Sequence, residues 1–302
     1  MNTTITITVG QLPGDSTVEI QNVIARAFGE FDRVVGRFTR FNEDSELANL
    51  NRNSGEWTVV TAELFMLVET MLDLAKKSNG AFDPTVIDFL ETYGYDRNYD
   101  FSRLDNPDLD KFVKKVTRER KSWQEIELDK SGPGIKLAKG QRLDLGGIGK
   151  GYAIDLAYKH LDKYQNFMID GGGDFRVKGG AHADPAQGEK YWKLSLKHKN
   201  QQTDGLQTVG TVKASNTALA CSGSWSRRVK QFHHLINTAT GKPVEDLQTV
   251  YVQAQAAALA DGWATALFVG GKELLQKLPD GMEAMLIGSD NKAVSTAGFH
   301  LH

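Results

Sequence analysis

The chain has 302 residues, a formal net charge of −2 and a single cysteine. Hydrophobic residues make up 40% and charged residues 25% of it, which excludes the disordered, collagen-like and disulfide-scaffold classes. The near-neutral charge offers no general basic field for nucleic acid. Because Cys221 is alone, an intramolecular disulfide and a multi-cysteine metal site are also excluded. No apolar run reaches the roughly 18 residues of a membrane-spanning helix.

The N-terminal segment lacks the basic start, the long apolar stretch and the lipidated cysteine of an export signal. The chain as written is therefore expected in the cytoplasm, although a chain trimmed of an export signal would look the same. It contains no internal repeat and no low-complexity segment. We expect one domain over residues 1–302, built as two lobes whose boundary the sequence does not locate.

The predicted elements alternate irregularly along the chain. Helices are expected at residues 16–34, 45–50, 61–77, 107–117, 148–164, 260–268 and 272–277, from apolar spacing and capping residues. Strands are expected at residues 4–9, 123–128, 135–137, 167–169, 191–198, 208–212, 235–236, 250–254, 285–287 and 293–295. Since strands and helices mix without a regular βαβ order, the predicted class is α+β, with mixed sheets and packed helices.

A glycine-rich segment at Asp144–Lys150 is the most informative motif. A strand ends in an acid, glycines follow, and a helix opens with Lys150 in its first turn. Glycines allow close approach of a ligand, and free amides with a lysine at a helix start attract an anion. The spacing is neither that of a P-loop nor GxGxxG. A phosphate site and a tight turn that needs glycine for packing both fit.

Two further patterns surround aspartates. Asp170 and Asp174 enclose three glycines after a buried strand, either as bare backbone for a flat ring or ribose, or as a tight turn. Asp261 and Thr265 lie one turn apart on a predicted helix and offer two oxygens to one hard cation such as Mg²⁺. The alternative is that Asp261 is a helix cap or first-turn acid. His234, before a short strand, is either structural or catalytic.

Together these motifs resemble the ApbE family of flavin transferases (FAD:protein FMN transferases), from about residue 35 to 290. The matching segments are Arg40 to Asn51, Gly80 to Val86, Asp144 to Tyr152, Asp170 to Asp174, Ser222-Gly223 and Asp261 to Thr265. The resemblance implies an α+β fold with FAD in a cleft between two lobes. It also implies an enzyme that splits the pyrophosphate of FAD, joins FMN to a threonine of an acceptor flavoprotein through a phosphoester, and releases AMP.

The same resemblance implies the site residues. FAD, as substrate, would be bound by Phe41, Asn51, Ala81, Phe82, Asp83, Asp144, Lys150, His234 and Leu235. Mg²⁺, as cofactor, would be held by Gly147, Asp261 and Thr265. The candidates for catalysis are Asp261, Asp83 and His234, and the sequence does not decide between the acids as the group that takes the hydroxyl proton.

The turn after His234 departs from the family pattern, because Asn237 and Thr238 replace an acid and a proline. This leaves open the rigidity of the turn and any catalytic role of the acid. Two other functions stay open as well. One is a Mg²⁺-dependent FAD pyrophosphatase giving FMN and AMP, with a change near Asn51 tipping the balance. The other is a non-enzymatic FAD-binding protein.

Overall fold

The computed structural model describes residues 3–181, 190–199 and 205–302. Its largest sheet has seven strands in the order β1-β5-β6-β9-β12-β13-β14, and every neighbouring pair is antiparallel. These strands are β1 (Ile5–Val9), β5 (Phe167–Gly171), β6 (Phe175–Lys178), β9 (Thr217–Gly223), β12 (Leu247–Ala254), β13 (Glu283–Gly288) and β14 (Ala293–Ser295). Helices and antiparallel strands in this arrangement confirm the α+β class.

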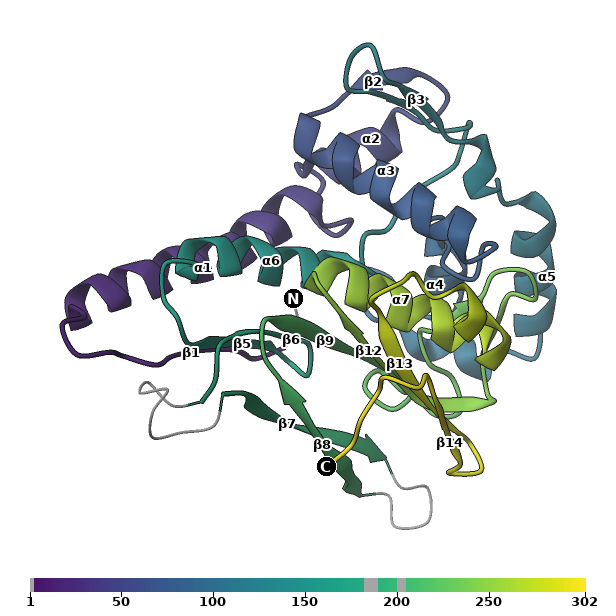
Figure 1. Ribbon diagram of the computed structural model, residues 1–302. Coiled ribbons are helices and arrows are strands. Elements are labelled where there is room, and N and C mark those ends of the chain that lie inside the picture. Colours follow the sequence, from purple (N-terminus) through teal and green to yellow (C-terminus); the bar gives the residue numbers. More distant parts are fainter. Residues whose placement is uncertain (1–2, 182–189, 200–204) are drawn as a thin grey trace.

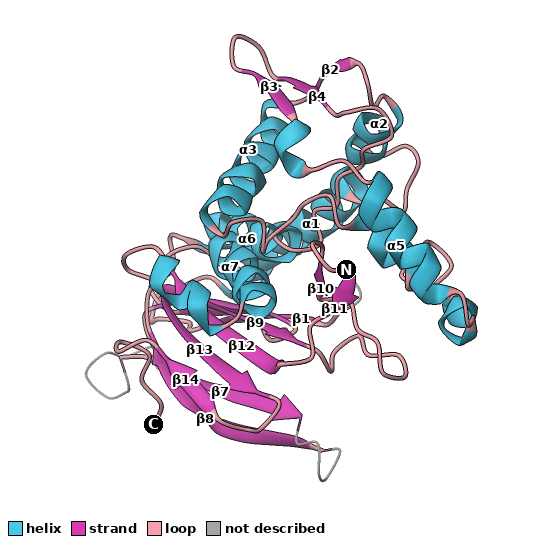
Figure 2. Cartoon of the chain, turned by 90° about the vertical axis from the view of Figure 1, so that its right-hand side faces the viewer, coloured by secondary structure: helices cyan, strands magenta, loops and turns pink. Residues whose placement is uncertain are grey.

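Helices cover one face of this sheet and a hairpin covers the other (Figures 1 and 2). On the helical face, α6 (Gly149–Leu161) contacts β5, α7 (Ala257–Gly270) contacts β9 and β12, and α1 (Thr17–Phe38) lies along α6. On the other face, β7 (Trp192–Lys199) and β8 (Leu206–Ala214) pair with each other. Their inward side chains bury a second apolar cluster with β6, β12 and β13.

A helical region continues the core away from the sheet (Figure 1). It contains α2 (Glu46–Arg52), α3 (Ala62–Lys77), α4 (Ile87–Thr92), α5 (Leu109–Glu119) and the small sheet β2 (Trp57–Val59), β4 (Gly134–Lys136) and β3 (Glu127–Asp129). The 3₁₀ helices are η1 (Phe101–Asp105), η2 (Trp123–Glu125) and η3 (Lys272–Lys277), and β10 (Ile236–Asn237) pairs with β11 (Lys242–Pro243). One cluster of buried residues runs from α2 and α3 through α6 and α7 to the large sheet.

The helix starts agree with the capping residues. Ser16 caps α1 and Thr61 caps α3, each accepting a hydrogen bond from a backbone N–H three residues on. Two predictions were wrong. Residues 123–125 form a 3₁₀ helix closed by a capping box, so the strand begins only at Glu127. Residues 272–277 are a 3₁₀ helix after Gly271 instead of an α-helix.

None of the helices in the described part of the chain combines the length and the apolar character needed to cross a lipid bilayer.

Candidate functional site

The charged residues of the glycine motif and of its neighbours meet at the start of α6. Lys150 Nζ lies 2.6 Å from Asp174 Oδ2, and Asp174 is fully buried. The backbone N–H of Cys221 on β9 donates to Asp174 Oδ1 at 2.9 Å. Burial opposes the charged form of Lys150, but the carboxylates of Asp174 and Asp261 outweigh it and raise the pKa of Lys150. The ammonium is therefore charged at neutral pH.

Asp261 faces this ammonium from α7. It is buried, and its Oδ2 accepts a hydrogen bond of 3.0 Å from the backbone N–H of Gly151. Burial, and then the charge of Asp174, raise the pKa of Asp261, and Lys150 acts against them. Because α7 begins at Ala257, Asp261 lies in its second turn, so it is not a cap or a first-turn acid.

Thr265 lies one helical turn after Asp261, as the spacing predicts. Its hydroxyl oxygen is 3.4 Å from that of Ser222, near the end of β9. Thr265 and Ser222 therefore meet where α7 packs on β9, and the residue before Ser222 on β9, Cys221, bonds to the buried Asp174.

Glycines bring the backbone of the motif against its neighbours. A Cβ on Gly151 would lie 2.2 Å from the carbonyl oxygen of Ala257, so α6 and α7 touch through their backbones. A Cβ on Gly147 would lie 2.7 Å from the ring of Phe82. The packing interpretation of these glycines is correct. An anion is not excluded, because the N–H groups of Gly147 and Lys150 have no hydrogen-bond partner among the residues described.

Asp144, at the other end of the motif, is held by Arg40. Arg40 Nε lies 2.7 Å from Asp144 Oδ2, and Asp144 Oδ1 accepts from the N–H of Gly146 at 2.6 Å. The Arg40 guanidinium lies over the half-buried ring of Phe41, 4.2 Å from its centroid. Two of the residues that the resemblance assigns to FAD, Phe41 and Asp144, are thus joined through one arginine.

Asn51 serves as a backbone clamp. Its Nδ2 donates to the carbonyl of Leu143 at 3.0 Å, and its Oδ1 accepts from the N–H of Leu143 at 2.8 Å. The amide therefore ties α2 to the segment that leads into Asp144. In this arrangement Asn51 fixes the backbone of Leu143, the residue before Asp144.

The segment around Asp83 is fixed by four contacts to that carboxylate. Oδ1 accepts from the N–H and the hydroxyl of Thr85 at 2.8 and 2.6 Å. Oδ2 accepts from the Thr238 hydroxyl at 2.9 Å and is paired with Arg120. The side chain is only 4% exposed. Both oxygens of this carboxylate are occupied by neighbouring groups, so Asp83 offers none to a ligand hydroxyl in this structure, whereas Asp261 and His234 are less fully bonded.

The neighbours of Asp83 are packed as well. Phe82 is buried against Gly147, and the methyl group of half-buried Ala81 faces Gly270 at the end of α7. The turn with the two departures is rigid, because Asn237 Oδ1 accepts from the N–H of Ala239 at 2.9 Å and its carbonyl accepts from Gly241 at 2.8 Å. The side chain and the carbonyl of Asn237 thus both close the turn in this chain.

The two histidines have different roles. His233 Nδ1 accepts from the N–H of Leu235, so its Nε2 carries the proton and donates to the carbonyl of Val244 at 2.8 Å. His234 has a buried Nδ1 without a partner among the described residues. Burial, and then the charge of Arg227, lower the pKa of His234 to about 3. His233 is structural, whereas His234 is neutral at pH 7 and has a ring nitrogen, Nδ1, that bonds to no described residue. Leu235 is buried in the main core.

Asp174 is the site residue that the sequence analysis did not select. The pattern of Asp170, three glycines and Asp174 gives the two acids equal weight. In the structure Asp170 closes its own turn by accepting from Gly173 at 2.9 Å, whereas Asp174 pairs with Lys150. A Cβ on Gly172 would meet the Thr3 hydroxyl, while Gly173 faces open space. The pairing of Asp174 depends on β9 lying beside β6, which no local pattern encodes.

A cavity of about 370 Å³ lies between α4, the end of α5 and the segment 139–142. Its lining is mainly charged, with Arg120 and Arg142 already paired to acids. Arg120 lines this cavity and is also paired with Asp83, one of the candidate site residues.

The implied Mg²⁺ can be tested against these donors. Asp261, Thr265 and the carbonyl of Gly147 are all oxygen donors, as Mg²⁺ requires. The described residues contain no group of three or more His, Cys, Asp or Glu that could hold a metal, so phosphate and water oxygens would have to complete the coordination, as is usual for Mg²⁺. Asp261 Oδ1 carries no hydrogen bond from a described residue, and burial makes a nearby cation favourable. The residues present therefore fit this ion.

A family model matches residues 1–286 of the chain, and its description is the ApbE family. The chain belongs to the ApbE family. A relative from Treponema pallidum, named FAD:protein FMN transferase, is 29% identical over 278 residues, which are 85% of this chain and 74% of that protein. A protein of the same name from Haemophilus influenzae is 27% identical, over 80% of this chain and 70% of its own length.

Solved structures of the ApbE family agree with this fold. The ApbE protein of Thermotoga maritima superposes with a TM-score of 0.82 at 23% identity, covering 98% of this chain and 94% of its own. The flavin transferase ApbE of Vibrio cholerae gives a TM-score of 0.80 at 22% identity, covering 99% of this chain and 95% of its own. Because the sequence identities are only 22–23%, these superpositions show that the fold is shared and nothing further.

Proposed function

We propose that this protein is an FAD:protein FMN transferase that uses Mg²⁺, attaches FMN to a threonine of an acceptor flavoprotein, and releases AMP. Membership of the ApbE family and the names of the relatives support flavin transfer. The observation that carries the proposal is the Lys150 ammonium at the start of α6, facing the buried Asp261 on α7 beside two free N–H groups.

This arrangement suits a diphosphate. The helix start, the amides of Gly147 and Lys150 and the lysine charge all attract phosphate oxygens. Lys150 is held in place by Asp174 before a ligand arrives, so its position costs little to fix on binding. Asp261, Thr265 and the Gly147 carbonyl would hold Mg²⁺, which neutralises charge on the phosphates as a Lewis acid.

The attacking hydroxyl has to come from outside, because no serine–histidine or cysteine–histidine pair lies within hydrogen-bonding distance among the residues that the structure describes. Cys221 is held as a thiol, since burial and the charge of Asp174 raise its pKa to about 12. We assign the hydroxyl proton to His234, whose Nδ1 has no partner. Its low pKa describes the protein without FAD. Two phosphate charges nearby would raise that pKa and make the ring a better base.

The test follows three products at once. The protein is incubated with FAD, Mg²⁺ and a candidate acceptor, and AMP, free FMN and protein-bound flavin are measured over time. A transferase gives AMP and protein-bound flavin in equal amounts. A pyrophosphatase gives AMP and free FMN at a rate that the acceptor does not change. A binding protein gives neither product.

A further inference from the structure

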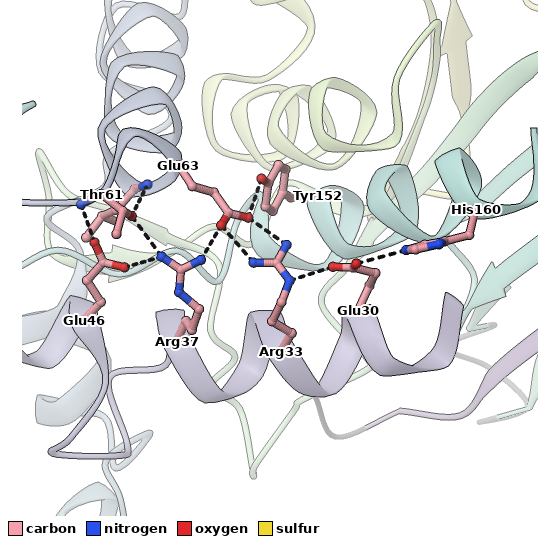
Figure 3. A network of polar contacts seen from close by, with 9 residues as sticks. Glu30, Arg33, Arg37, Glu46, Thr61, Glu63, Tyr152 and His160 are labelled. Atoms are coloured by element: carbon pink, nitrogen blue, oxygen red, sulfur yellow. Dashed lines mark hydrogen bonds and ion pairs between the residues drawn. The ribbon is translucent and has the colours of Figure 1, made fainter. Parts of the chain in front are cut away.

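A network of charged and polar side chains connects the helices α1, α2, α3 and α6 on the side of α6 that faces α1 (Figure 3). Glu63, in the first turn of α3, is at its centre. Its two oxygens accept a bidentate pair of hydrogen bonds from Arg33 of α1, each 2.8 Å long. The hydroxyl of Tyr152 donates to Glu63 Oε1 at 2.7 Å. Arg37 of α1 also pairs with Glu63.

The network contacts α6 at two residues, Tyr152 and His160. Tyr152 is in the first turn of the helix, two residues after Lys150. His160 is near its last turn and lies 3.0 Å from Glu30 Oε1, and Glu30 in turn accepts from Arg33 at 2.7 Å. Eight residues separate Tyr152 and His160, or about 12 Å along the helix. The same set of charges therefore holds one end of α6 beside the candidate site and the other end far from it.

The contact at Tyr152 is sheltered and well oriented. Tyr152 is 8% exposed and the Glu63 side chain 21%. The hydrogen bonds from Arg33 outweigh the effect of burial and lower the pKa of Glu63 to about 2. A bidentate arginine fixes the direction of the carboxylate, so the acceptor for the Tyr152 hydroxyl points one way.

The first turn of α6 has a second anchor, where the N–H of Gly151 donates to Asp261. Lys150 directly precedes Gly151 and Tyr152 in the same turn, so both anchors fix the backbone from which its side chain extends. We propose that Tyr152, oriented by Glu63 and Arg33, is a positioning residue that sets the first turn of α6 and with it the Lys150 ammonium. The inference rests on the proposed role of Lys150 in binding FAD.

Three variants separate positioning from general stability. Tyr152→Phe keeps the ring and removes only the hydroxyl. His160→Gln removes the distant contact of the same network on the same helix. Glu63→Gln keeps an oxygen for the Tyr152 hydroxyl but loses the charge that pairs with Arg33. The readouts are FAD affinity from flavin fluorescence, thermal unfolding, and hydrogen exchange of the amides in residues 149–153.

Tyr152→Phe should weaken FAD binding about fivefold, the value of one hydrogen bond expressed as a binding constant. It should also speed exchange in residues 149–153. His160→Gln should leave FAD affinity and that exchange unchanged, with faster exchange only near the end of α6. Glu63→Gln should lower the unfolding temperature and weaken FAD binding, though by no more than Tyr152→Phe does, because the amide oxygen can still accept from Tyr152 without Arg33 to orient it.

Unchanged FAD affinity in Tyr152→Phe, or equal losses in Tyr152→Phe and His160→Gln, would overturn the positioning role. A wild-type protein that does not bind FAD would overturn the proposed function instead. In that case hydrogen exchange still decides the inference, since it needs no FAD: faster exchange at the first turn in Tyr152→Phe alone supports it, and unchanged exchange contradicts it.

Discussion

A lysine ammonium between two buried carboxylates dominates the candidate site at the scale of single residues. Lys150 and Asp174 are a buried pair at 2.6 Å, and removing one partner of such a pair leaves an uncompensated charge inside the protein. Asp261 is different, because its ionised form is disfavoured by burial and by Asp174 before any further cation arrives. The two acids therefore predict different mutational behaviour.

Lys150→Met should cost about 3–5 kcal/mol of stability, because Asp174 is then buried without a partner. Adding Asp174→Asn removes that charge and should restore most of the stability. Neither variant should bind FAD well: a lost hydrogen bond to a charged phosphate costs about 1–3 kcal/mol of binding free energy. Riboflavin, which has no phosphate, should be almost indifferent to both. Chemical denaturation and flavin fluorescence measure the two effects. Lys159→Met, on the exposed side of α6, is the control.

Recovery of FAD affinity in the double variant would contradict this account, because the lysine would then have acted through folding alone.

Asp261→Asn tests the metal. An amide oxygen can still accept from Gly151, so the fold should persist, and stability without Mg²⁺ should change little because burial and Asp174 raise the pKa of Asp261 and already disfavour its charged form. Mg²⁺ should raise the unfolding temperature of the wild type and not of the variant, and FAD turnover should be lost in the variant. Asp170→Asn, an acid that only closes its own turn, is the control. Equal stabilisation of both variants by Mg²⁺ would place the ion elsewhere.

At the scale of elements, the sequence predicts helices better than sheet edges. Apolar spacing and side-chain caps located α1 and α3, and apolar residues with the glycine motif located α6 and α7, which begin without a side-chain cap. β6 and β9 were missed, although they place Asp174 and Ser222 in the site. Their residues are small or mixed, and they become strands by pairing with distant neighbours. The sequence could therefore predict features that a single helix carries, such as Lys150 at the start of α6 and the spacing of Asp261 and Thr265 on α7, and not the contacts that strands assemble.

The contact between α6 and α7 depends on one glycine. Gly151→Ala would place a methyl group 2.2 Å from the Ala257 carbonyl oxygen, so the helices must separate. We expect a loss of stability of about 1–3 kcal/mol or more, as for overpacked cores, together with weaker FAD binding because the bond to Asp261 moves. Gly149→Ala is the matched control: its Cβ would meet only Leu145 Cβ, at 3.8 Å. Thermal unfolding of the two variants measures the difference. Equal unfolding temperatures would show that the close approach of Gly151 to the Ala257 carbonyl does not matter for stability.

At the scale of the whole molecule, buried histidines should link folding to pH. Burial lowers the pKa of His233 and His234 below the ordinary 6.5. The unfolded chain then binds more protons than the folded one as the pH falls below 6.5. Stability is fully present above that pH and declines as the pH falls, by up to about 1.4 kcal/mol per pH unit for each histidine.

The raised pKa of Asp261 acts in the opposite direction, so denaturant unfolding should show this decline between pH 7 and pH 4 most clearly in the Asp261→Asn background. His234→Gln should make the fall in stability with decreasing pH shallower, because one of the two histidines that bind a proton on unfolding is gone. Glu63, with a pKa of about 2, should add to the loss only below its ordinary value of 4.5. The same slope in the wild type and in His234→Gln would show that His234 does not stay neutral in the fold.

Mass spectrometry of an acceptor flavoprotein tests the central claim most directly. The acceptor, incubated with this protein, FAD and Mg²⁺, should gain the mass of FMN less water on one threonine, with one AMP released for each flavin attached. Replacing that threonine by alanine should stop attachment and leave the FAD affinity of the transferase unchanged. Free FMN accumulating at the same rate with and without the acceptor, while no acceptor gains flavin, would contradict the assignment of this chain as a transferase.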